Sequence, residues 1–220
     1  MVLEGEVTRK MRRDVASGSL LIAGALAGVV VMAFHPSGLG PLGTEAGQRI
    51  ARTNVLVHGL ALVAVPVTFL GLLGVARRLG PTGLTSAALV AFGYGSAAVM
   101  SAAIASGFVA TDTAAQIVAA EGSRVPQAFL VYTHAWNQGY ARVYAAAFAA
   151  GTLLFSAAML RGPARMGAAA IAGLVIGAFL LLGVLSGYLT MSLHGFALLT
   201  LLQSSWFVGL GGWLCRESAA

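Results

Sequence analysis

Residues 168–189 read AAAIAGLVIGAFLLLGVLSGYL and carry no charged side chain. An α-helix rises about 1.5 Å per residue, so a run of about 20 apolar residues crosses a hydrocarbon core about 30 Å thick. Backbone polar groups in lipid must be bonded within their own segment, which leaves a helix as the structure that this stretch can adopt there. The stretch therefore predicts an integral membrane protein.

Five further runs of the same kind occur, and together they predict an all-α, six-transmembrane-helix bundle. The predicted spans are 17–34, 54–76, 84–110, 127–160, 168–189 and 192–214. Residues 17–214 then form one membrane domain, with a basic N-terminal tail at 1–16 and a short C-terminal tail at 215–220. The long connections are expected to differ, with 35–53 as a loop rich in Gly and Pro and 111–126 holding a short surface helix near 113–120.

The first apolar run follows the basic stretch RKMRR at residues 9–13. This run is longer than the apolar region of a secretory signal peptide, so we expect it to be retained as the first span.

The 13 basic residues lie mostly in short connections beside the spans, which orients a membrane protein rather than binding nucleic acid. Nine lie on one side of the predicted bundle: Arg9, Lys10, Arg12, Arg13, Arg77, Arg78, Arg161, Arg165 and Arg216. Four lie on the other side: Arg49, Arg52, Arg124 and Arg142. Basic connections stay in the cytoplasm, so both termini are expected there (N-in/C-in). The preference for Arg over Lys, with abundant Ala and Gly, favours a bacterial cytoplasmic (inner) membrane.

Two short patterns recur and suggest three repeated helical hairpins. HGLALV begins at His58 in the second span, and HGFALL begins at His194 in the last. SGFV begins at Ser106 near the end of the third span, and SGYL begins at Ser186 near the end of the fifth. Parallel repeats of this kind occur in membrane proteins. Chance similarity among helices rich in Ala, Leu and Gly is the alternative.

The four histidines, His35, His58, His134 and His194, fall at similar depth on the side opposite the termini. Three lie about 30 Å from the arginines at the other end of their spans, and His134 about 40 Å. Imidazole is a common metal ligand, and bundles build cofactor sites from facing helices. His58 and His194 are the leading ligand candidates because each lies inside a span and precedes Gly. His134 comes next, and His35, which precedes Pro36, is expected in the loop.

Sulfur and amide side chains accompany these histidines at helical spacing. Met32 precedes His35 by three residues and Met191 precedes His194 by three, and thioethers beside imidazoles suit copper, especially Cu(I). Asn54, Asn137 and Gln138 lie one turn from His58 or His134, where amides can orient imidazoles.

A pair of trans histidines equally suits haem b. Arg142 could then bind a haem propionate, although snorkelling to the interface explains this arginine as well.

The leading functional hypothesis is therefore a membrane protein with a haem or metal site, serving electron transfer, metal handling or a membrane oxidoreductase. A small-solute transporter or channel with a polar outer vestibule remains open. So does a non-catalytic accessory subunit that packs with a membrane-protein partner or with copies of itself. Histidines at the interface without any ligand are the simplest alternative. The membrane centre is nearly free of ionisable residues, which disfavours a proton-driven transporter, and no catalytic motif identifies an enzyme.

Overall fold

The computed structural model describes residues 2–38, 43–119, 125–161 and 167–217, and the regular structure in these ranges is helical. The helices are α1 (Val2–Ala33), α2 (Glu45–Leu79), α3 (Gly83–Ala103), η1 (Ile104–Val109), α4 (Ala110–Ala119), α5 (Val125–Arg161), α6 (Gly167–Leu185) and α7 (Leu193–Glu217). The π-helical turn η1 joins α3 and α4 into one continuous rod. Within the described ranges six helices are long and apolar enough to cross a membrane, which confirms the predicted number.

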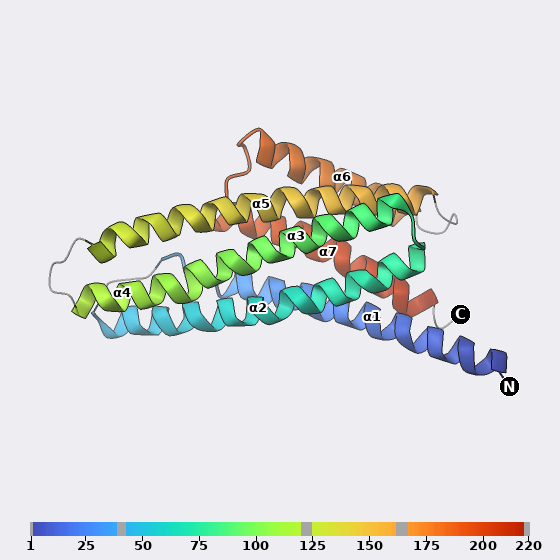
Figure 1. Ribbon diagram of the computed structural model, residues 1–220, viewed down its shortest axis with the longest axis horizontal. Coiled ribbons are helices and arrows are strands. Elements are labelled where there is room, and N and C mark those ends of the chain that lie inside the picture. The colour runs from blue at the N-terminus through green and yellow to red at the C-terminus, as the bar shows by residue number, and fades with distance from the viewer. Residues whose placement is uncertain (1, 39–42, 120–124, 162–166, 218–220) are drawn as a thin grey trace.

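Both chain ends lie at one end of the bundle, called here the terminal end (Figure 1). At the opposite, distal end, α1, α6 and α7 stop while α4 and the first turns of α2 and α5 continue. We call these continuing segments the distal extension. α2 has 35 residues and α5 has 37. Each is therefore over 50 Å long, against a hydrocarbon core of about 30 Å.

The expected loop at 35–53 is partly wrong, because α2 already begins at Glu45. Thr44 caps this helix, with its hydroxyl accepting a hydrogen bond from the Gly47 N–H at 3.1 Å. Residues 45–53, EAGQRIART, are too polar to belong to a membrane span, yet most of them are compatible with a helix. The expected separate surface helix near 113–120 is instead the continuation of α3 through η1, and its last residue, 120, lies outside the described residues.

Helix packing places α1 between α2 and α7, and α5 between α3 and α6. Two of the three predicted hairpins, α1 with α2 and α3 with α5, pack along their lengths, whereas α6 and α7 make little contact. The hairpin repeat therefore remains a prediction.

A column of aromatic rings fills the middle of the bundle. Phe196 of α7 lies 5.5 Å from Tyr144 of α5, and Tyr144 lies 4.5 Å from Phe148, measured between ring centroids. Phe148 then packs against Phe92 of α3 at 5.1 Å, and Phe155 and Phe207 surround Phe92. These rings are largely removed from solvent, so the bundle is tightly packed between its distal part and the terminal end.

Basic side chains collect at the terminal end. Arg77 donates a hydrogen bond to the Ser17 hydroxyl at 3.0 Å, and Arg78 pairs with Asp14 at 3.7 Å. The basic residues of the first turns of α1 are exposed, as are Arg161 and Arg216. Arg124 and Arg165 lie outside the described residues.

We predict that Gly71→Ala destabilises the bundle, because α1 and α2 approach closely there. A methyl group on Gly71 would lie 2.7 Å from the backbone N and Cα of Leu21. Relief would require the helices to separate, and overpacking of this kind costs about 1–3 kcal/mol. The thermal unfolding midpoint in detergent, followed by circular dichroism, measures the loss.

Gly93→Ala is the matched control for this prediction. Its added methyl group would meet the Phe69 ring at an ordinary 3.7 Å, so we expect an unchanged or slightly higher midpoint. Equal midpoints for the two variants would contradict the close approach of α1 and α2.

Candidate functional site

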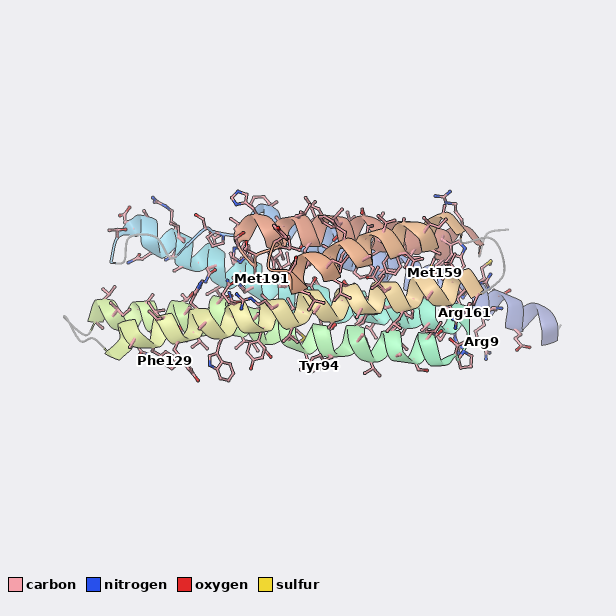
Figure 2. The ribbon with its side chains drawn as sticks, turned by 90° about the horizontal axis from the view of Figure 1, so that it is seen from above. Arg9, Tyr94, Phe129, Met159, Arg161 and Met191 are labelled. Carbon is pink, nitrogen blue, oxygen red and sulfur yellow. The ribbon has the colours of Figure 1, made fainter. Side chains whose placement is uncertain are left out.

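A cavity of about 400 Å³ lies at the level where α1 ends and α7 begins. Met191 lines this cavity. Along the bundle, Met191 lies between Phe129, which is nearer the distal end, and Met159, which is near the terminal end (Figure 2). The polar side chains lining the cavity are His35, Ser37, Asn54, His58, Ser106, Thr133, His134, Asn137, Gln138 and Ser192. The helices α2 and α5, the π-helical turn η1 and two connecting segments therefore contribute polar side chains to one chamber.

His35 and His58 meet directly in this chamber. Their Nε2 atoms are 3.3 Å apart, and the rings meet edge to face with centroids 4.8 Å apart. His35 follows the end of α1, whereas His58 lies in α2 and is only 5% exposed. The residues that follow α1 thus place the His35 imidazole against the buried His58 imidazole of α2.

Both imidazoles are held by backbone carbonyl groups through their other nitrogen. His35 Nδ1 lies 2.9 Å from the Pro36 oxygen, and His58 Nδ1 lies 2.7 Å from the Asn54 oxygen. A carbonyl oxygen only accepts hydrogen bonds, so each Nδ1 must carry the proton that it donates. In the neutral rings each Nε2 then carries a lone pair, and the two lone pairs face each other.

Burial lowers the pKa of His35 below its ordinary value of 6.5, and the hydrogen bond to Pro36 offsets only part of this effect. The neutral ring is therefore the favoured form of His35 at neutral pH. A neutral His35 cannot supply a proton to the gap between the two Nε2 atoms.

The π-helical turn η1 supplies the third group beside this pair. The Ser106 hydroxyl lies 2.7 Å from His58 Nε2 and also 3.0 Å from the Ala102 carbonyl oxygen. A serine hydroxyl has one proton, so Ser106 donates either to the imidazole or to the carbonyl. Glycine at the next position permits this contact, because a side chain on Gly107 would overlap His58.

Asn54 fixes α2 against η1. Its Nδ2 group donates to the Ser106 carbonyl oxygen at 2.8 Å and to the Thr111 hydroxyl at 3.1 Å. A π-turn disturbs the regular ladder of backbone hydrogen bonds, and an amide side chain can serve a carbonyl displaced in this way. Asn54 therefore holds His58 and Ser106 together from both sides, through its own carbonyl and through its side chain.

Most of the residues proposed from the sequence gather at this cavity. His134, Asn137, Gln138, Met32 and Met191 line it together with His35 and His58. Gln138 Nε2 also donates to the Met191 carbonyl oxygen at 3.2 Å, so α5 holds the segment that leads into α7. The sequence placed Asn54 beside His58, and the structure adds its contact with η1.

Two proposed residues are placed elsewhere. His194 and Arg142 are both exposed, and neither is among the described residues that line the cavity. His58 is therefore paired with His35, rather than with the His194 that the repeat pattern favoured.

Ser106, Gly107 and Thr111 were not proposed as site residues. The SGFV pattern drew attention to the first two, but nothing in it signals a π-turn.

The described residues contain no group of three or more His, Cys, Asp or Glu side chains arranged to hold a metal ion. The His35–His58 pair brings two Nε2 atoms together and so offers two nitrogen atoms to an ion. Any further group that coordinates an ion there would have to be a thioether, a hydroxyl or an amide of the protein, or a small molecule such as water.

We predict that Asn54→Ala lowers the free energy of unfolding by about 1–2 kcal/mol, the upper range for polar contacts between membrane helices. The change removes the donor contacts to Ser106 in η1 and to Thr111 in α4, and it leaves the Ser106 carbonyl without its partner from α2. Thermal unfolding of the purified protein in detergent measures the effect.

Asn137→Ala serves as its control, because Asn137 faces the same cavity but makes no hydrogen bond within the described part of the chain. We expect its midpoint to stay within about 0.5 kcal/mol of the unmodified protein, as for substitutions away from specific contacts. A loss of stability as large as that for Asn54→Ala would show that the contact of Asn54 with η1 contributes no more to stability than the other side chain does.

Comparisons with known proteins give no relative for this chain. No protein-family model, no curated protein and no solved structure matches it.

Proposed function

We propose that this chain is a multi-pass membrane protein that binds a single metal ion in its distal cavity through His35 and His58. One observation carries the proposal: two Nε2 atoms 3.3 Å apart, each belonging to a ring whose Nδ1 donates to a carbonyl. Two lone pairs at this distance repel each other unless a hydrogen-bond donor or a cation satisfies them, and the one proton of Ser106 can satisfy only one of the two. A metal ion removes that repulsion and uses both lone pairs as ligands.

The spacing of the two nitrogens suits a shared ion. Imidazole nitrogens lie about 2.0–2.1 Å from zinc, so two of them on a tetrahedral ion are about 3.3 Å apart. The observed separation of His35 Nε2 and His58 Nε2 is also 3.3 Å. Metal handling requires no residue beyond these ligands, so it is the role that we favour among those left open by the sequence.

Haem b fits this pair poorly. Trans axial histidines lie on opposite faces of the macrocycle, and two nitrogens in contact leave no space for a porphyrin between them. A single ion needs only the volume between the rings and the adjoining chamber.

A carrier for a small solute is the second candidate, because a cavity of about 400 Å³ is within the range of small-molecule sites. The aromatic column that begins at Phe196 separates this chamber from the terminal end. A solute could cross only if these rings moved, so the cavity in this conformation is better suited to binding than to conduction.

The location that we propose is a bacterial cytoplasmic membrane with both termini in the cytoplasm. The support is the collection of exposed basic side chains at the terminal end, since basic segments next to spans stay in the cytoplasm. In this orientation the cavity and the distal extension face the outer compartment, and the metal ion enters from there.

We expect the purified protein to retain close to one metal ion per chain, and His35→Ala and His58→Ala each to abolish retention. The loss of either ring leaves one imidazole, which holds an ion too weakly to survive dialysis. Elemental analysis by mass spectrometry, after expression in medium containing copper, zinc and iron, gives the stoichiometry.

His194→Ala is the matched control, because it removes an imidazole that does not line the cavity. It should keep the full metal content and the unfolding midpoint of the unmodified protein. A metal-free unmodified protein that is folded would sink the proposal, and loss of metal from His194→Ala alone would move the site to the other histidine.

The orientation is tested with single cysteines in a Cys215→Ser background. Tyr188→Cys, at a position 93% exposed just beyond α6, should react with a membrane-impermeant maleimide in intact cells. Met11→Cys, at a position 40% exposed in α1, should react only after the membrane is permeabilised. The reverse pattern would invert the proposed topology.

A further inference from the structure

The lining of the cavity is electrically neutral. It contains no Asp, Glu, Lys or Arg among the residues that the structure describes. The electrostatic cost of holding an ion away from water rises with the square of its charge, and carboxylate ligands normally offset it for divalent ions. A chamber lined by neutral groups at the edge of the apolar bundle therefore favours a monovalent ion.

Two thioethers line the same chamber. Met32 lies in the last turn of α1, where its carbonyl oxygen accepts a hydrogen bond from the His35 N–H at 3.4 Å. Met191 is 5% exposed, and Gln138 holds its backbone. Methionine is unbranched and flexible, so its sulfur can turn toward an ion without movement of the helix. Both thioether side chains therefore line the chamber that holds the imidazole pair.

We propose that the ion is copper in its monovalent state, bound by His35 and His58 and completed by the thioethers of Met32 and Met191. This inference rests on the proposed function and names its ligand. Thioether and imidazole form a ligand set that suits copper(I), whereas carboxylate and water suit magnesium, calcium and manganese. A ligand set of two imidazoles and two thioethers leaves the charge of the bound ion at +1.

Ser106 makes the imidazole available to the ion. Its hydroxyl group can turn so that the hydrogen bond to His58 Nε2 is replaced by one to the Ala102 carbonyl oxygen, because both acceptors are within hydrogen-bond distance. When copper occupies the lone pair of His58, the serine therefore keeps a hydrogen bond within its own helix. The hydroxyl of Ser106 therefore keeps a hydrogen-bond partner on binding.

The test is an anaerobic titration of the whole protein, in lipid nanodiscs, with copper(I) against a coloured copper(I) chelator, and a parallel titration with zinc(II). We expect one copper(I) per chain and much weaker binding of zinc(II). Met32→Leu and Met191→Leu should each weaken copper(I) binding by about tenfold or more, since even residues that only orient a metal ligand are worth that much. Sulfur scattering in the copper X-ray absorption spectrum should fall in the same variants.

Met159→Leu is the control, because Met159 is a buried methionine near the terminal end, remote from the cavity. It should bind copper(I) as the unmodified protein does. Zinc(II) binding that exceeds copper(I) binding, with no effect of Met32→Leu or Met191→Leu, would overturn the copper assignment and leave the His35–His58 site standing. Absence of binding for both ions would overturn the proposed function itself.

Discussion

The approach of α2 to the π-helical turn η1 is the interaction on which the distal half of the molecule depends. Lipid offers no hydrogen bonds, so a turn that disturbs its own backbone ladder needs a partner from a neighbouring helix. Asn54 provides that partner, and Gly107 gives the space for α2 to come close enough. The same contact buries His58 and presents its Nε2 atom to Ser106. The need to satisfy a backbone in an apolar medium thus also determines where an imidazole lone pair points.

Hydropathy predicted the number of spans and the depth of the histidines but not the lengths of the helices. It measures the thickness of lipid that a segment can occupy, so it placed the start of α2 at 54 and passed over the polar turns from Glu45. Hydropathy could not predict the pairing of His35 with His58, for a different reason. That contact depends on how closely α1 lies against α2, and glycines along the two helices, Gly24, Gly71 and Gly74, allow this approach. A repeat pattern therefore favoured His194, while helix packing selected His35.

The aromatic column and the polar chamber are two consequences of one packing arrangement. α5 contributes Tyr144 and Phe148 to the column, and one to two turns further toward the distal end it contributes Asn137 and Gln138 to the chamber. Bulky rings exclude water and solutes from the middle of the bundle, and the polar groups begin where the rings end. Phe196 belongs to both features, because its ring packs on Tyr144 and also lines the chamber.

Histidines at a membrane interface are usually explained by access to water, and His194 and His134 are exposed in that way. His35 and His58 behave differently, because each gives its Nδ1 proton to a carbonyl and turns its Nε2 toward the other ring. Access to water alone does not explain this arrangement, since it places two lone pairs close together, which is unfavourable. Ser106 can relieve one of them by donating its proton to His58, but its single proton leaves the Nε2 atom of His35 without a donor among the residues that the structure describes. The remaining lone pair is what a cation would satisfy, and the neutral walls around it limit the charge that such a cation carries.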